Sequence, residues 1–242
     1  NSARNLLLNQ RVSTDAPFVS PDVWKANGAD PIPFEGPVFA GLDLSARTDL
    51  TALVLVGQVE GVWQVFPHFW TPEQGLLERA RRDRQPYDVW QRQGFLRTTP
   101  GASVDYGFVA VEIAEILGGL DVHAVAYDRW RMDVLKRELD ALGLSLPLVP
   151  WGQGFRDMSP ALDALEVELL NHRIAHGMHP VLTMCAANAV TERDPAGNRK
   201  LSKSRTTGRI DGMVALAMAM GASQTAEAPT PDPYASRGLI LI

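Results

Sequence analysis

Two apolar stretches of this chain each end in an aspartate, and a third aspartate lies near the start of another apolar stretch. These acids are Asp43, Asp128 and Asp211. They lie 85 (128 − 43) and 83 (211 − 128) residues apart, so only a tertiary fold can bring them together. A fold that does so forms a carboxylate cluster, and such a cluster needs divalent cations. The pattern therefore points to metal-dependent chemistry on phosphodiesters.

The spacing of apolar and turn residues predicts an α/β fold with a mixed five-stranded sheet flanked by helices. Strands are expected at residues 38–43, 51–58, 61–69, 122–127 and 146–151. Helices are expected at residues 104–117, 130–142, 159–171, 180–189 and 209–222, with two further pieces between 71 and 94. Glu60-Gly61 predicts a hairpin turn, and Ser159-Pro160 predicts the start of a helix.

Proline-rich segments divide the chain into three parts. Residues 1–36 are predicted to form an N-terminal arm or linker with a short helix at 21–26, although an ordinary extension fits the composition equally well. Residues 37–224 are predicted to be the folded domain, with an auxiliary polar β-hairpin at 190–204. Residues 225–242 are predicted to be a flexible tail.

Composition limits the compartment and the class of partner. The net charge of −5 is a mild argument against a nucleic-acid binder, because such proteins are often basic. Cys185 is the only cysteine, which excludes an intramolecular disulfide and suits a reducing cytosol. No apolar stretch reaches the ~18 residues that cross a bilayer, and residues 1–8 carry no signal peptide. No membrane association is expected.

The three aspartates are predicted to bind two Mg²⁺ or Mn²⁺ ions, because these cations prefer oxygen ligands. Asp43 would bridge both ions, while Asp128 would hold one ion and Asp211 the other. Each acid also has a simpler explanation: Asp128 as a helix N-cap, Asp211 as a favourable charge at a helix N-terminus, and Asp43 as part of a turn. Gly212 favours the metal interpretation, because a glycine after the acid permits close approach of a backbone, metal or phosphate.

Basic residues gather in the predicted hairpin and at its exit. This cluster is predicted to guide the phosphates of DNA past the carboxylates, and a solvated charged loop is the alternative. Its predicted DNA contacts are Arg199, Lys200, Lys203, Arg205 and Arg209. Lys203 or Arg205 would also be placed to stabilise charge in the transition state.

Several stretches, in the order in which they occur, resemble the nuclease domain of the large terminase subunit of tailed bacteriophages. The resemblance covers most of residues 38–222. Its main stretches are Phe39-Ala40-Gly41-Leu42-Asp43-Leu44-Ser45, Val125-Ala126-Tyr127-Asp128-Arg129-Trp130 and Thr207-Gly208-Arg209-Ile210-Asp211-Gly212. Leu7-Leu8-Asn9-Gln10 and Trp24 resemble the connector that joins the motor and nuclease domains of this family.

The resemblance implies a ribonuclease-H-like fold and a metal-dependent endonuclease that cuts concatemeric double-stranded viral DNA at the start and end of packaging. It also implies an ATPase domain, a small terminase subunit and a portal as partners, and the host cytoplasm as the location. The chain contains no Gly-x-x-x-x-Gly-Lys-Ser/Thr phosphate loop. It is therefore interpreted as an isolated nuclease portion, with residues 1–36 as the linker from the ATPase domain.

Three other interpretations stay open at this point. Gly41-x-Asp43-x-Ser45 with Thr51 also resembles the first phosphate motif of actin-like sugar kinases. A non-catalytic DNA-binding assembly module would keep the fold and the basic hairpin without needing the three acids. A ribonuclease-H-like resolvase or transposase would share the acids, and a preference for DNA junctions would distinguish it.

Overall fold

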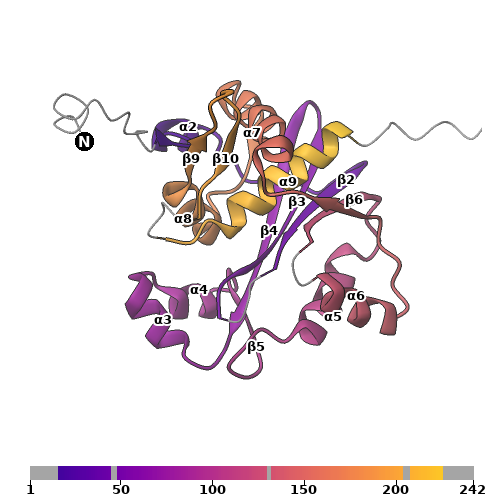
Figure 1. Ribbon diagram of the computed structural model, residues 1–242. Coiled ribbons are helices and arrows are strands. Elements are labelled where there is room, and N and C mark those ends of the chain that lie inside the picture. The colour runs from indigo at the N-terminus through magenta and orange to yellow at the C-terminus, as the bar shows by residue number, and fades with distance from the viewer. Residues whose placement is uncertain (1–15, 45–47, 130–131, 204–207, 226–242) are drawn as a thin grey trace, which may run out of the picture.

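A mixed β-sheet forms the middle layer of the protein (Figure 1). The computed structural model describes residues 16–44, 48–129, 132–203 and 208–225. Along the sheet the strands follow the order β5-β4-β3-β2-β6-β7, and β8 pairs with β4. Their bounds are β2 Val38–Asp43, β3 Thr51–Val59, β4 Val62–Pro72, β5 Arg97–Thr99, β6 Val122–Asp128, β7 Leu148–Trp151 and β8 Ile174–Ala175.

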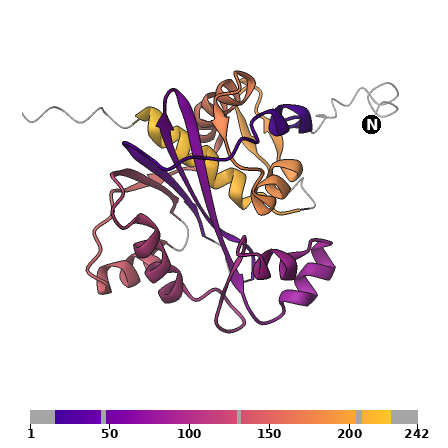
Figure 2. The ribbon, with the colours of Figure 1, turned by 180° about the vertical axis from the view of Figure 1, so that it is seen from behind.

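Helices cover both faces of this sheet (Figures 1 and 2). On one face lie α5 (Tyr106–Leu117) and α6 (Met132–Ala141), and on the other lie α7 (Phe155–Leu170), α8 (Pro180–Asn188) and α9 (Asp211–Thr225). Alternate residues of β3 face the two sides: Leu53 and Leu55 pack towards α5 and α6, and Ala52, Val54 and Val56 pack towards α9. The sheet is therefore buried on both faces, as a three-layer α/β fold requires.

The predicted core elements are confirmed, with additions at the edges of the sheet. All five predicted strands form, and Glu60 and Gly61 both adopt positive φ values, 50° and 80°, in the predicted hairpin turn. The short strands β5 and β8 were not predicted. The predicted helix start at Ser159 is wrong, because α7 begins at Phe155 and contains Pro160 in its interior.

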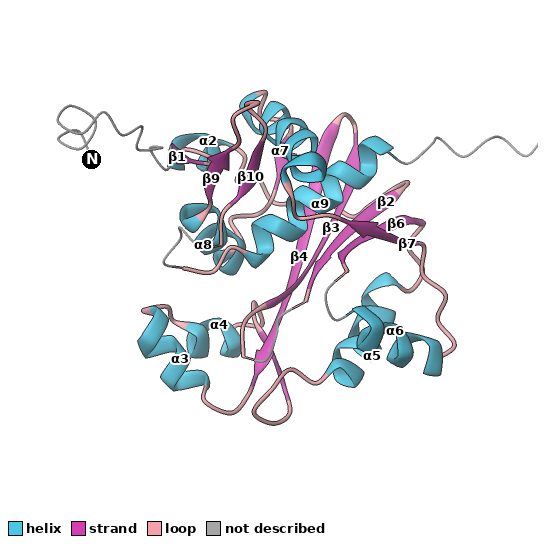
Figure 3. Ribbon diagram, viewed as in Figure 1, coloured by secondary structure: helices cyan, strands magenta, loops and turns pink. Residues whose placement is uncertain are grey.

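The N-terminal segment packs on the domain from Ala16 onward. β1 (Ala16–Pro17) pairs with β9 (Val190–Arg193), which pairs in turn with β10 (Arg199–Leu201) in a separate three-stranded sheet (Figure 3). The predicted short helix forms as α2 (Pro21–Ala26), whose Trp24 stacks on His176 with ring centroids 3.9 Å apart. Thr225, the first residue of the predicted tail, is the last residue of the final helix, and residues 1–15 and 226–242 lie outside the described residues.

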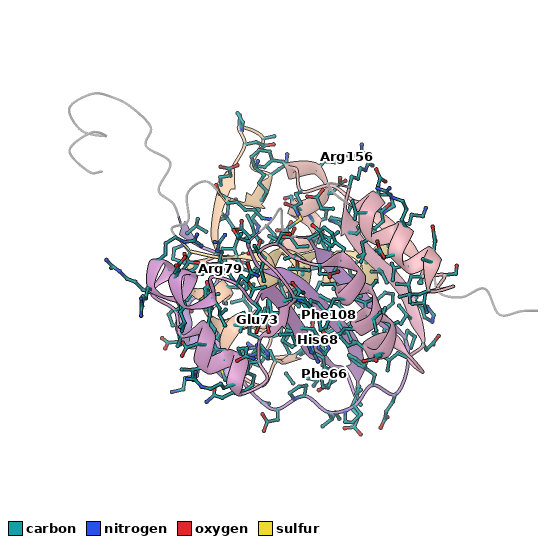
Figure 4. All side chains as sticks on the ribbon, turned by 90° about the horizontal axis from the view of Figure 1, so that it is seen from below. Phe66, His68, Glu73, Arg79, Phe108 and Arg156 are labelled. Carbon is teal, nitrogen blue, oxygen red and sulfur yellow. The ribbon has the colours of Figure 1, made fainter. Side chains whose placement is uncertain are left out.

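A pair of short helices, α3 (Leu76–Asp83) and α4 (Tyr87–Arg92), lies beyond the end of β4. Arg79 anchors α3, because its guanidinium donates hydrogen bonds to the carbonyl oxygens of Pro72 and Gln74. Arg79 is buried, whereas the side chain of Arg156 at the start of α7 extends into solvent (Figure 4). Among the described residues, no helix combines the length and apolar character needed to cross a membrane.

Candidate active site

The ends of two neighbouring parallel strands place Asp43 beside Asp128. Leu42 of β2 is in register with Tyr127 of β6, so the aspartates that follow them lie at the same edge of the sheet. Both strands run in the same direction, and their carboxyl ends therefore meet there. Asp43 is 2% exposed, which means that its carboxylate is buried at this edge.

Helix α9 brings Asp211 to the same edge. The helix crosses β2 so closely that a Cβ atom on Gly41 would lie 1.9 Å from the carbonyl oxygen of Ala215. Gly41 lies two residues before Asp43, and Ala215 lies one helical turn after Asp211. The crossing therefore sets the start of α9 against the end of β2.

Lys203 and Gln153 complete the surroundings of the buried carboxylates. The Nζ atom of Lys203 lies 2.7 Å from Asp43 Oδ2 and 3.6 Å from Asp211 Oδ1. Gln153 follows β7 and donates a hydrogen bond from Nε2 to Asp43 Oδ1 at 3.1 Å. Sequence reasoning missed Gln153 and named Lys203 only for DNA and transition-state contacts. The signal for Gln153 was its place just after the strand that neighbours β6.

Burial and mutual repulsion change the protonation of this cluster. Burial, followed by the nearby Asp43 carboxylate, raises the pKa of Asp211 to about 6. Burial opposes the charged form of Lys203, but the carboxylates of Asp43 and Asp211 outweigh it and raise the pKa of the Lys203 ammonium. Asp128 contributes further in the same direction, which places its charge near this ammonium. Lys203 therefore stays positively charged among the three predicted acids.

The chemistry of this cluster suits a hard divalent cation. Within the described part of the chain, no three His, Cys, Asp or Glu side chains are arranged as a ready set of metal ligands. Instead, the ammonium of Lys203 bridges Asp43 and Asp211. Buried carboxylates need a positive partner, and their oxygens are the donors that Mg²⁺ and Mn²⁺ prefer. The residues present therefore fit such an ion.

Gly212 serves close packing at the start of α9. A Cβ atom at this position would lie 2.7 Å from Cζ of Phe69 and 3.1 Å from Cδ1 of Leu182. The prediction that Gly212 admits a backbone, metal or phosphate is thus wrong, because an aromatic side chain of β4 occupies that space. The glycine lets the start of α9 lie flat against the sheet.

Arg209 ties the start of α9 to two other segments. Its guanidinium lies 2.6 Å from an oxygen of Asp49, in the connection after β2, and 3.3 Å from an oxygen of Asp83, at the end of α3. Its carbonyl oxygen accepts a hydrogen bond from Asn188 Nδ2 at 3.2 Å. The contacts hold the segment that leads into Asp211 in a fixed position.

We expect Arg209→Met to lower the free energy of unfolding by about 2 kcal/mol, since Asp49 loses this cation and Asp83 keeps only Arg82 as a partner. Denaturation in urea measures this change. The matched control is Arg92→Met, which removes an exposed pair with Asp88 and should cost under about 0.5 kcal/mol. Equal losses in the two variants would contradict the anchoring role of Arg209.

The other predicted DNA contacts have partners of their own where the structure describes them. Arg199 is buried and pairs with Asp163 and Glu166 of α7. Lys200 pairs with Glu192 at 2.9 Å. Arg205 lies outside the described residues. The geometry therefore gives Arg199 a role in docking the hairpin on α7, and DNA contact by this cluster stays a prediction.

Comparison with known proteins identifies the family. The family model of the terminase large subunit, endonuclease domain, matches residues 5–227. This chain belongs to that family. It is 62% identical over 224 residues to the terminase large subunit of Enterobacteria phage HK97, a match that covers 92% of this chain and 44% of the relative. It is 27% identical over 200 residues to protein YmfN of Escherichia coli K12, over 78% of this chain and 44% of that protein.

Solved structures agree with this placement. The crystal structure of the HK97 large terminase matches with a TM-score of 0.85, over 91% of this chain and 46% of that one. The large terminase nuclease of thermophilic phage G20c shares the fold at 14% identity, with a TM-score of 0.53 over 84% of this chain and 97% of that one. The predicted ribonuclease-H-like fold is confirmed. The terminase nuclease chain spans less than half the length of its curated relatives.

Proposed function

We propose that this terminase nuclease domain is a metal-dependent endodeoxyribonuclease that cuts concatemeric double-stranded DNA at the start and end of genome packaging. The observation that supports it best is the meeting of Asp43 and Asp211 around one positive charge, with Asp128 at the end of the adjoining strand. Because the chain belongs to the terminase endonuclease family, the reaction proposed for this cluster is endonucleolytic cleavage.

Asp43, Asp128 and Asp211 would hold two Mg²⁺ or Mn²⁺ ions. When bound, such ions activate water and stabilise the leaving oxygen of a phosphodiester. The large terminase nuclease of phage G20c has been solved with bound magnesium and with bound cobalt, which supports the binding of a divalent ion by a nuclease domain of this fold. Gln153 would keep the Asp43 carboxylate oriented through its hydrogen bond to Oδ1.

A plasmid-cleavage assay of this chain tests the proposal. Cleavage is expected with Mg²⁺ or Mn²⁺, and loss of cleavage is expected with chelator. A folded chain that binds DNA but does not cut under any divalent ion would favour a DNA-binding assembly module instead.

Cation binding is expected to weaken as the pH falls below about 6, because Asp211 then takes up a proton. The pKa of Asp211 in the folded chain lies above its ordinary value of 3.8. A proton therefore binds to the metal-free folded protein in this pH range and competes with the cation. Asp43, Lys203 and Arg209 face this group. Calorimetric titration with Mn²⁺ at pH values above and below about 6 measures the effect. Competition by one proton can lower the Mn²⁺ affinity by at most about tenfold per pH unit. A flat affinity profile would contradict it.

The exposed side of the hairpin is proposed to guide DNA. We expect the double substitution of Arg193 and Lys200 to alanine to reduce the slope of log binding constant against log salt by about 0.9 for each lost phosphate contact. Fluorescence anisotropy with duplex DNA measures the slope. The matched control replaces Lys136 and Arg137 with alanine. Both side chains are exposed on α6, on the other side of the sheet, so the slope should stay unchanged. An unchanged slope in the hairpin variant would refute the guide role.

Further partners belong to the whole protein. We propose that residues 1–36 continue into an ATPase domain, that residues 37–224 are the nuclease domain and that residues 225–242 form a tail. The small terminase subunit and the portal are proposed as partners, and the host cytoplasm as the site of action. The HK97 large terminase, of which this chain covers less than half, supports a longer parent protein.

A further inference from the structure

The ammonium group of Lys203 occupies the position of a bridging cation. It lies 2.7 Å from Asp43 Oδ2 and 3.6 Å from Asp211 Oδ1. A lysine ammonium is a compact point charge with three donors, so it can neutralise two carboxylates at once. We propose that Lys203 is a positioning residue that holds the acid pair before a metal ion binds, and that the ion must displace its ammonium group. This inference rests on the proposed function.

The backbone that carries Lys203 is fixed to the body of the domain. Ser202 donates a hydrogen bond from its backbone N–H to the carbonyl oxygen of Val190 at 3.0 Å, and its hydroxyl donates to Glu192 at 3.1 Å. Arg199 donates from its backbone N–H to the hydroxyl of Ser159 on α7 at 3.2 Å. Because the strand is held at these points, exchange of the ammonium for a metal ion requires only rotation of the Lys203 side chain.

The side chain has a route into solvent that its partners lack. The Lys203 side chain is 47% exposed, whereas the Asp43 side chain is 3% exposed and the Asp211 side chain 13%. The flexible four-carbon stem lets the ammonium move into water while the carboxylates stay in place. The acids can therefore keep their positions and change their counter-ion.

This arrangement has two consequences of opposite sign when Lys203 is removed. The metal-free fold loses stability, because two buried carboxylates then face each other without the ammonium group between them. Metal affinity rises, because the incoming ion no longer competes with an ammonium group and relieves that repulsion. A lysine with a purely structural role would produce the first effect without the second. A lysine that repels the metal ion but stays in place would raise the affinity on removal without becoming more reactive when the ion binds, so the reactivity of Lys203 in the wild type identifies the exchange.

The test is calorimetric titration of Mn²⁺ into the full chain and its Lys203→Met variant. We expect the variant to bind Mn²⁺ at least about fivefold more tightly, the lower end of usual coupling between competing sites. We also expect saturating Mn²⁺ to raise the melting temperature of the Lys203→Met variant by more than it raises the melting temperature of the wild type. The matched control is Lys136→Met, whose side chain is exposed on α6, on the other face of the sheet from α9. It should bind Mn²⁺ as the wild type does.

A second variant and a measurement on the wild-type chain keep the proposal testable if Lys203→Met fails to fold. Lys203→Gln should show the same increase in affinity. In the wild type, Mn²⁺ should increase the rate at which Lys203 is acetylated by a water-soluble reagent, relative to Lys200, as mass spectrometry can record. Mn²⁺ affinity that is unchanged or weaker in folded Lys203 variants would overturn the exchange, and so would an unchanged rate of Lys203 acetylation in the wild type. In either case, Mn²⁺ binding by the wild type would still support the metal site. Absence of Mn²⁺ binding in every protein would overturn both.

Discussion

Asp43→Asn is expected to reduce DNA cleavage by at least about a thousandfold, equivalent to about 4 kcal/mol of transition-state stabilisation. Asp43 is the buried acid at the centre of the site, where Lys203 and Gln153 both contact its carboxylate. Asparagine has the same shape and retains an oxygen that can accept from Gln153. It lacks the negative charge that would hold a divalent cation, so the loss should fall on metal binding and leave the fold intact.

A plasmid-cleavage time course with Mg²⁺ or Mn²⁺ measures this loss, and circular dichroism confirms that the variant is folded. The matched control is Asp121→Asn, at the opposite end of β6 from Asp128, where the acid is 68% exposed and pairs with His123. Its cleavage rate should equal that of the wild type. Cutting by the Asp43 variant at the wild-type rate would remove Asp43 from the catalytic machinery.

The layers of the fold could be predicted because each core element carries its own periodic signal. The five predicted strands follow alternation or short apolar runs, and their order in the sheet places β2 beside β6. The strands β5 and β8 could not be predicted, because pairs of two or three residues form only where β4 already offers a partner. The start of α7 was misplaced because Ser159-Pro160 is typical of a helix start, yet Ser159 instead accepts a hydrogen bond from Arg199.

The candidate site could be predicted in part for the same reason. Asp43 and Asp128 end predicted strands, so their meeting at one edge of the sheet follows from topology. Gln153 and Lys203 contact Asp43 across 110 and 160 residues of sequence, and no local pattern records such contacts. The partners of basic residues are equally hard to predict. The sequence shows the charge of Arg209 but not its pairing with Asp49 and Asp83.

Gly41→Ala is expected to destabilise the fold by about 3 kcal/mol, at the upper end of usual overpacking costs. The added Cβ atom would lie 1.9 Å from the carbonyl oxygen of Ala215 and 2.9 Å from the backbone nitrogen of Ala219. These are backbone atoms of a helix that is buried from Asp211 to Ala222, so no side chain can rotate away to make room. The helix must shift from β2, and its first residue, Asp211, must shift with it.

Urea denaturation measures the stability loss, and Mn²⁺ titration measures the effect on the site, where affinity should fall because Asp211 moves from Asp43. The matched control is Gly36→Ala, because no heavy atom lies within 4 Å of a Cβ atom built there. It should change the free energy of unfolding by less than about 1 kcal/mol. If the Gly41 variant kept wild-type stability and Mn²⁺ affinity, α9 would be free to move over β2, and the crossing at Gly41 could not be what brings the two acids together.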